Sequence, residues 1–137
     1  MSTPRLGRVQ LQIMQALWQR GRATAREITD ALNERESVAH STVQTLLRKL
    51  EKKGALTHEV DDRTFVFRPL VDPENVRLKA TSELIERLFA GSPSGLVSYL
   101  LRHKEIPTEQ IEEIRRLIDE AEESSSKMTA FDGTKEE

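Results

Sequence analysis

The side chains with the clearest capacity for chemistry lie in the segment HSTVQTLLRKLEKKG, which spans residues 40–54. Gln can pair with adenine and Arg with guanine through two hydrogen bonds each, and Ser and Thr hydroxyls can bond to phosphate oxygens. The free N–H groups at the start of a helix offer a further phosphate site. The segment is therefore a candidate contact surface for double-stranded DNA, through His40, Ser41, Gln44, Thr45 and Arg48, with Lys49 and Lys52 on the flank.

Apolar residues in the same segment define the helix that must position these side chains. They are spaced as i, i+3, i+4 and i+7 and therefore share one face: Val43, Leu46, Leu47 and Leu50. Gly54 suits the residue that follows the last helical turn. A basic amphipathic helix is by itself usually just a solvated surface, so the choice between a solvated face and a DNA-contacting face depends on the neighbouring elements.

Two further helices are predicted before this segment. Apolar residues recur at helical spacing from Leu6 to Trp18, and Gly21 ends that helix. Thr24 followed three residues later by Glu27 is the capping-box pattern that opens a second helix. The connection to the third helix is short, as in a helix-turn-helix unit, in which the N-terminal residues of the second motif helix contact base edges.

A β-hairpin is predicted after the third helix. Residues 55–60 and 63–68 are rich in Val, Phe and Thr, and they flank a two-residue polar turn at Asp61-Asp62. The order helix, helix, helix, hairpin predicts a winged helix-turn-helix. Arg63 lies next to the expected turn, where a wing tip can reach a neighbouring phosphate. The alternative is that Arg63 pairs with one of the two aspartates.

Charge divides the chain into a basic half and an acidic half. The net charge is −2, but residues 1–70 carry 12 Lys and Arg against 8 Asp and Glu, whereas residues 71–137 carry 9 against 15. The first half is thus +4 and the second −6. A basic first half suits a polyanion, and an acidic second half would be kept away from DNA.

Composition excludes several classes of function. The chain has no Cys, which excludes disulfides, thiol nucleophiles and zinc fingers. His40, His58 and His103 show no metal-ligand spacing, and no glycine-rich phosphate loop is present. We therefore expect no enzyme activity, no metal and no cofactor. With no apolar run of roughly 18 residues and no signal segment, we expect no membrane association and a cytoplasmic location.

The second half of the chain is predicted to be helical. Asp72-Pro73 and Ser92-Pro93 each combine an N-cap residue with proline at the first helical position. The apolar stripes exceed what three short helices can bury among themselves, which favours a homodimer interface over packing against the first half of the same chain. The residues expected at this interface are Leu84, Leu88, Leu96, Leu100, Ile111, Ile114 and Ile118.

The segments LGRVQLQIMQALW, TAREITDAL, STVQTLLRKLEKKGALTHE, RTFVFRPLV and LFAGSPSGLVSYLL together resemble the penicillinase-repressor family, which includes the β-lactamase and methicillin-resistance repressors. The resemblance covers about residues 6–121. It implies a winged-helix homodimer that represses transcription at dyad operators and dimerises through its C-terminal helices. It also implies DNA contacts at Ser41, Thr42, Gln44, Thr45 and Lys49, with Arg63 as the wing arginine.

Three positions depart from the family pattern. Ala39 stands where many relatives have a serine that caps the third helix, so Ser41 or His40 would have to take over that role. Tyr99-Leu100 stands where some relatives have an Asn-Phe bond cleaved by a regulatory protease, which is a candidate partner here too. The absence of Cys excludes the metal sensing of a copper-responsive branch.

Taken together, the sequence predicts a mainly α fold with a small β-wing. We expect a winged-helix DNA-binding domain over 1–71, a helical dimerisation domain over 72–122 and a disordered tail over 123–137. The function expected is that of a sequence-specific repressor that binds a palindromic operator as a homodimer. The alternative is a winged-helix interaction module whose basic face docks an acidic protein.

Overall fold

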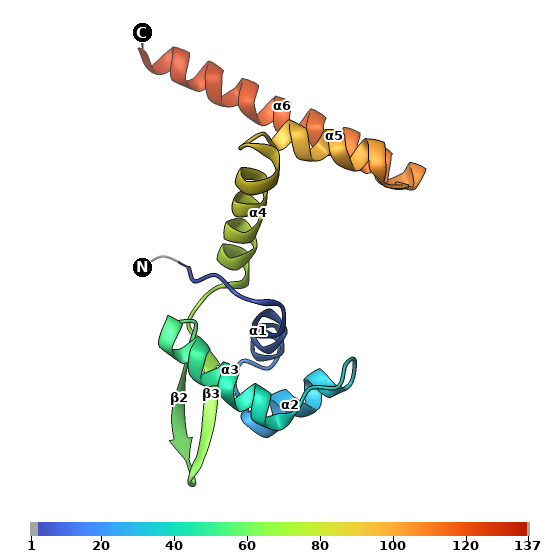
Figure 1. Ribbon diagram of the computed structural model, residues 1–137. Coiled ribbons are helices and arrows are strands. Elements are labelled where there is room, and N and C mark those ends of the chain that lie inside the picture. Colours follow the sequence, from blue (N-terminus) through green and yellow to red (C-terminus); the bar gives the residue numbers. More distant parts are fainter. Residues whose placement is uncertain (1–2, 137) are drawn as a thin grey trace. The chain divides into compact units, whose positions relative to one another are not determined.

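The computed structural model describes residues 3–136, with their side chains through Lys127. It divides into two compact units, Met1–Gly91 and Ser92–Glu137 (Figure 1). Each unit is described by itself. The elements of the first unit are α1 (Arg8–Arg20), β1 (Ala23–Thr24), α2 (Ala25–Asn33), α3 (His40–Lys53), β2 (Leu56–Asp61), β3 (Thr64–Pro69) and α4 (Pro73–Phe89). Those of the second are α5 (Pro93–His103) and α6 (Thr108–Glu136).

Three helices and a small sheet enclose one hydrophobic core in the first unit. Each helix contributes its apolar stripe, and the strands contribute Leu56 and Phe67. The predicted helix ends are confirmed: Gly21 and Gly54 have positive φ angles of 82° and 84°, and the Thr24–Glu27 capping box is formed. The largest fully buried side chains are Ile13, Met14, Leu17, Ile28, Val43, Leu47, Leu50 and Leu56. The structure therefore confirms the mainly α fold class with a β-wing.

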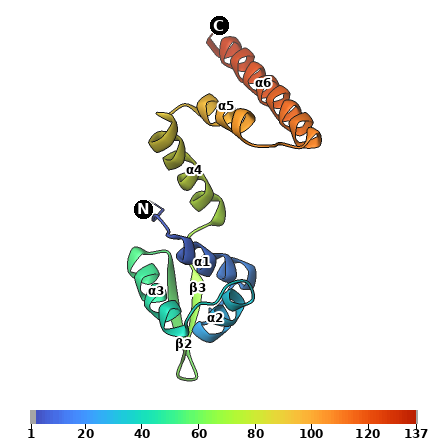
Figure 2. The same ribbon diagram turned by 45° about the vertical axis from the view of Figure 1, so that its right-hand side comes forward.

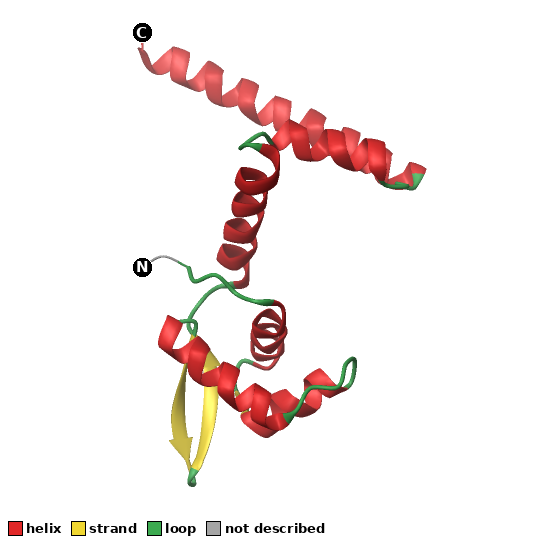
Figure 3. Ribbon diagram, viewed as in Figure 1, coloured by secondary structure: helices red, strands yellow, loops and turns green. Residues whose placement is uncertain are grey.

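The sheet has three antiparallel strands in the order β1-β3-β2. Figure 3 shows the two long strands of this sheet, β2 and β3, side by side. Strand β1 was not predicted, because two residues are too few to show a period. Ala23 pairs with Phe67. In Figures 1 and 2 the β2–β3 hairpin lies beside α3 and its tip extends beyond the helices. This hairpin is the wing.

The turn of the wing differs by one residue from the sequence prediction. Asp61 pairs with Thr64, so the two turn residues are Asp62 and Arg63, not Asp61 and Asp62. Both have positive φ, 50° and 69°, as a two-residue type I′ hairpin requires. Arg63 therefore lies at the tip of the wing itself and not in the strand after it.

The first compact unit includes α4 in addition to the segment 1–71, whereas the division into a DNA-binding domain over 1–71 and a dimerisation domain over 72–122 stays a prediction. The indole N–H of Trp18 donates to the Val71 carbonyl at 2.9 Å, which ties the linker to α1. Lys79 on α4 donates to the Thr3 carbonyl, and Arg5 pairs with Glu83 at 3.3 Å. These contacts join the N-terminal segment to α4, and the compact unit runs to Gly91.

The second unit begins with the predicted cap, because the Ser92 hydroxyl accepts from the N–H of Gly95 at 3.0 Å. The sequence predicts a disordered tail after residue 122, whereas the structure continues α6 to Glu136. The disordered tail over 123–137 stays a prediction. Within the described residues, no helix has both the length and the hydropathy needed to cross a bilayer.

Candidate nucleic-acid interface

Packing of α3 against the core determines which of its side chains face outward. Val43, Leu47 and Leu50 are buried and Leu46 is partly buried, as predicted from their spacing. The opposite face is left to solvent. Of the α3 residues predicted to contact DNA, His40 is half-buried and the others are exposed: Ser41, Thr42, Gln44, Thr45, Arg48, Lys49 and Lys52.

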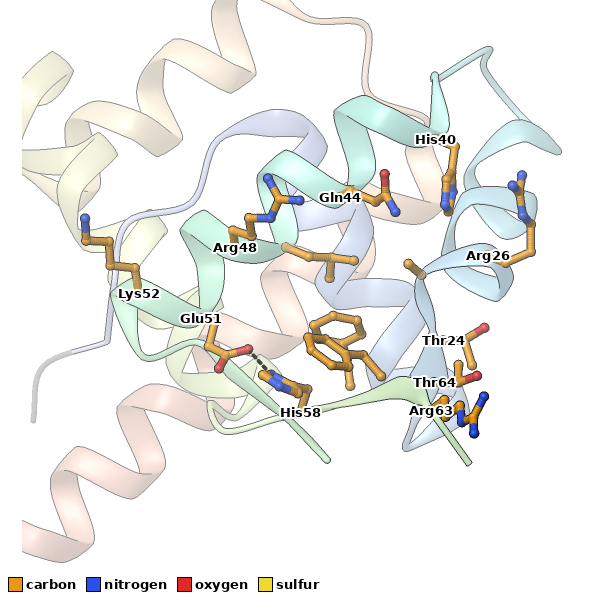
Figure 4. A pocket seen from close by; sticks show the side chains of 14 residues that line it. Thr24, Arg26, His40, Gln44, Arg48, Glu51, Lys52, His58, Arg63 and Thr64 are labelled. Atoms are coloured by element: carbon orange, nitrogen blue, oxygen red, sulfur yellow. Dashed lines mark hydrogen bonds and ion pairs between the residues drawn. The ribbon is translucent and has the colours of Figure 1, made fainter. Parts of the chain in front are cut away.

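A groove of about 710 Å³ lies between α3 and the wing (Figure 4). Five predicted DNA-contacting residues line it: His40, Gln44, Arg48, Lys52 and Arg63. The other four, Ser41, Thr42, Thr45 and Lys49, project from α3 outside the groove. The structure thus divides the predicted surface into an outer face of the helix and a groove wall that the helix shares with the wing.

The loop between α2 and α3 is fixed by hydrogen bonds that position the start of α3. The Asn33 carboxamide donates to the Val38 carbonyl at 2.8 Å and accepts from the Val38 N–H at 3.1 Å. The Arg8 guanidinium donates two hydrogen bonds to the Glu36 carboxylate, 2.8 Å to Oε2 and 2.7 Å to Oε1. The Arg8 guanidinium donates hydrogen bonds to the Glu36 carboxylate and attracts it electrostatically, which holds the pKa of Glu36 below its usual value.

His40 joins the first turn of α3 to α2. The Thr29 hydroxyl donates its only proton to the Ala25 carbonyl at 2.8 Å, and its oxygen lies 2.8 Å from His40 Nδ1. Thr29 must therefore accept from Nδ1, which carries the hydrogen and leaves Nε2 as the ring's outward-facing nitrogen. Ala39 is the N-cap and makes no side-chain cap bond. Neither predicted substitute, His40 or Ser41, caps the helix within the described part of the chain.

The four predicted DNA-contacting cations form no ion pairs with the described side chains of this chain. Among the side chains described, Arg48, Lys49, Lys52 and Arg63 form no ion pair, which removes the alternative in which Arg63 pairs with a turn aspartate. Lys53 differs, because its ammonium donates to the Arg5 carbonyl at 2.9 Å and to the Gln10 carboxamide at 3.0 Å. Lys52 and Lys53 are adjacent, yet only Lys52 is available to a phosphate.

A pair of side chains in the groove was missed by sequence reasoning. His58 on β2 lies 2.6 Å from the Glu51 carboxylate on α3, and its ring stacks on Phe65 with centroids 4.0 Å apart (Figure 4). Glu51 and His58 are seven residues apart across a helix–strand boundary, and this spacing has no sequence signature. No group of three metal-binding side chains occurs within the described residues.

The side chains predicted at the dimer interface lie on α4, α5 and α6. Leu84 and Leu88 on α4 are 41% and 69% exposed, Leu100 on α5 is 39% exposed, and Ile118 on α6 is 50% exposed. The remaining three are half-buried: Leu96, Ile111 and Ile114. Both units, each taken by itself, therefore carry exposed apolar side chains among the residues predicted at the interface.

Comparison with known proteins assigns the family. A family model described as Penicillinase repressor matches residues 6–120, which is most of the chain. The chain belongs to the penicillinase repressor family. This confirms the resemblance found in the sequence, and with it the coarse functional prediction of a DNA-binding transcriptional repressor.

Individual relatives match over most of their length. The penicillinase repressor of Bacillus licheniformis is 26% identical over 117 residues, which cover 85% of this chain and 91% of the relative. The methicillin resistance regulatory protein MecI of Staphylococcus aureus strain N315 is 23% identical over 107 residues, covering 78% and 87%. The solution structure of the DNA-binding domain of the repressor BlaI is 30% identical, covers 55% of this chain and 93% of that one, and has a TM-score of 0.49.

Proposed function

We propose that this repressor acts as a homodimer that binds a palindromic operator, with α3 of each protomer in a major groove and each wing tip against a neighbouring phosphate. The observation that carries the proposal is the polar face of α3. It is exposed, is built on a buried apolar face, and retains cations without internal partners. The wing beside this helix, with Arg63 at its tip, favours a DNA-contacting face over a face that only contacts solvent.

Within this surface the residues have different roles. Gln44 is the candidate for base recognition, since a carboxamide can form two hydrogen bonds with adenine. Arg48 can do the same with guanine. Ser41, Thr42, Thr45, Lys49 and Lys52 are candidates for backbone contacts, which fix the register of the helix but carry no sequence information.

Dimerisation is proposed to bury the exposed leucines and isoleucines of α4, α5 and α6. Apolar side chains as exposed as Leu88 (69%) and Ile118 (50%) are typical of a surface that another chain covers. A two-fold axis makes the same surface self-complementary. It would also set two recognition helices about 34 Å apart, one turn of DNA, and so predicts two half-sites at that spacing.

DNA recognition is tested by footprinting on the intergenic region beside the gene, followed by binding to variants of the protected sequence. Gln44→Ala should change the base preferred at one position of each half-site by about 1–3 kcal/mol. An equal loss on every sequence would contradict base recognition by Gln44. No shift of duplex DNA at low salt would favour the alternative of an acidic protein partner.

Dimerisation is tested separately by analytical ultracentrifugation. Leu88→Asp combined with Ile118→Asp should convert a dimer into a monomer, because each change buries a charge in the interface. Leu70→Asp is the matched control, since Leu70 is also an exposed leucine (52%) but lies in the linker before α4. A double variant that keeps the dimer mass would contradict this interface.

A regulatory protease is the proposed route of release from DNA. Tyr99 and Leu100 are 54% and 39% exposed, so the bond between them lies near the surface. It also lies inside α5, and a protease must first open that helix to reach it. Cleavage there would remove α6 from the chain and with it part of the proposed interface.

A further inference from the structure

The groove between α3 and the wing has an apolar floor that DNA contact does not explain. Its floor is formed by side chains from three elements, Ala25 on α2, Leu47 on α3, and Phe65 and Phe67 on β3. Phosphates are charged, and among the base edges only the thymine methyl is apolar, so DNA leaves most of such a floor without an apolar partner. A volume of about 710 Å³ falls within the range of roughly 300–1,000 Å³ that is typical of small-molecule sites.

Phe65 gives this floor an aromatic surface. Its side chain is 49% exposed, whereas Phe67 next to it on the same side of the strand is 7% exposed. The Phe65 ring lies nearly parallel to the His58 imidazole, with an interplanar angle of 14°, and edge-on to Phe67 at 6.3 Å. The three rings form a cluster in which only His58 and Phe65 are stacked, and the exposed part of Phe65 can accept another planar ring.

Charge around the groove selects for an anion. Four cations line it, Arg26, Arg48, Lys52 and Arg63, and none of them forms an ion pair with a described side chain. The carboxylate in the lining is that of Glu51, which is already hydrogen-bonded by His58 at 2.6 Å. An aromatic floor inside a cationic rim is complementary to a flat ring that carries a carboxylate.

We propose that this groove binds a small aromatic carboxylate, with its ring on Phe65 and its carboxylate at the cationic rim, and that this binding competes with DNA. The second part rests on the proposed function, because Gln44, Arg48, Lys52 and Arg63 would contact both ligands. A bound aromatic acid would neutralise the rim and fill the space beside α3. It would therefore act as an effector that releases the operator without proteolysis.

Ligand binding is measured first in the absence of DNA, on the full chain, with 2-naphthoate as the probe and its uncharged amide as the matched ligand. The naphthoate should saturate one site per protomer and bind at least about tenfold more tightly than the amide, because only the acid pairs with the rim. Phe65→Ala should weaken naphthoate binding about tenfold. Val60→Ala is the control, since Val60 is 62% exposed on the same hairpin but does not line the groove.

Competition is measured next, as the affinity of each protein for a labelled operator with and without naphthoate. A competitor raises the apparent dissociation constant for the operator by the factor 1 + L/Kd, where L is the competitor's free concentration and Kd its own dissociation constant. Naphthoate at about ten times its own dissociation constant should therefore weaken operator binding of the parent chain and of Val60→Ala about tenfold, and that of Phe65→Ala only about twofold. Absence of saturable binding, equal binding of acid and amide, or full binding by Phe65→Ala would each overturn the site. Naphthoate binding without any effect on the operator would overturn the competition. A chain that binds naphthoate but no DNA would contradict the proposed function and leave the site standing.

Discussion

Two adjacent lysines at the end of α3 allow the DNA-facing surface to be tested with a built-in control. Lys52 lines the groove and its ammonium has no protein partner among the described side chains, whereas Lys53 donates to Arg5 and to Gln10. Both lie in the last turn of the same helix, so both interact equally well with the helix dipole. Lys52→Ala and Lys53→Ala remove the same charge from almost the same place.

The expected difference follows from the release of counterions. Each phosphate that a lysine neutralises contributes about 0.9 to the slope of log K against log salt concentration. A homodimer carries two copies of Lys52, so Lys52→Ala should lower the slope by about 1.8. Between 50 and 200 mM salt, a fourfold change, the parent protein should therefore lose about twelvefold more affinity than the variant. Lys53→Ala should leave the slope nearly unchanged and should lower stability by roughly 1–2 kcal/mol, through its lost hydrogen bonds.

The assay is fluorescence anisotropy of a labelled operator and of an unrelated duplex across that range of salt. Lys52→Ala should weaken binding to both duplexes to a similar extent, since phosphate contacts carry no sequence information. If Lys53→Ala reduced the slope as much as Lys52→Ala, net charge and not side-chain placement would control binding. If neither variant changed the slope, the end of α3 would not lie against the DNA backbone.

Four further predictions concern individual residues of α2, α3 and the α5 cap. Thr29→Val should release the His40 ring and weaken operator binding by roughly fivefold per hydrogen bond lost, whereas Thr29→Ser should keep the parent affinity; equal affinity of all three proteins would argue against this role. Leu47→Ala, at a residue that is 1% exposed, should cost about 2–5 kcal/mol in urea unfolding, and a cost under about 1 kcal/mol would contradict its place in the core. Hydrogen bonds from Thr24, first from its backbone N–H and then from its hydroxyl, lower the pKa of Glu27 below 4.5 in the folded state. The Glu27 carboxylate therefore stabilises the fold above that pH, and this stabilisation is lost as the pH falls through the lowered pKa. Glu27→Gln keeps a capping partner but removes the titratable carboxyl, so the melting temperature of the variant should fall less steeply in acid than that of the parent protein. If both melting temperatures fell in parallel as the pH is lowered, this explanation would be contradicted. Ser92→Ala should remove about 1 kcal/mol from the start of α5 and speed chymotrypsin cleavage after Tyr99 about fivefold, while unchanged cleavage would mean that opening of α5 does not limit access.

Features set by short-range chemistry were predictable from the sequence. The caps at Thr24, Asp72 and Ser92 and the glycines after α1 and α3 mark helix ends by mechanisms that act within four residues. The spacing of apolar residues then identifies the buried face of each helix, and with it the exposed face of α3. The mainly α fold and the outward-facing candidate residues both follow from these two kinds of signal.

Features set by pairing between distant segments were not predictable. The wing turn shows this best, because Asp61, Asp62 and Arg63 are all acceptable polar residues for a turn. Pairing across the sheet decides between them, since the observed register places Phe67 opposite both His58 and Ala23 and buries its ring. That register puts Arg63 in a left-handed conformation that arginine does not favour. Tertiary packing therefore overrides the local preference and moves the arginine to the wing tip.

The position of the free positive charge was not predictable either. The count of +4 in residues 1–70 indicates a basic half but does not say where its charge can act. Tertiary contacts decide this, because they pair Arg8 with Glu36 and Arg68 with Glu59 and attach Lys53 to the N-terminal segment. Among the described side chains of this unit, Arg22, Arg35 and Arg87 form no ion pair and lie elsewhere. Most of the other unpaired cations gather around one groove, Arg26, Arg48, Lys52 and Arg63, with Lys49 on the outer face of α3. The proposed DNA-facing surface is thus basic for two reasons of equal weight: α3 supplies cations, and internal contacts pair many of the cations elsewhere.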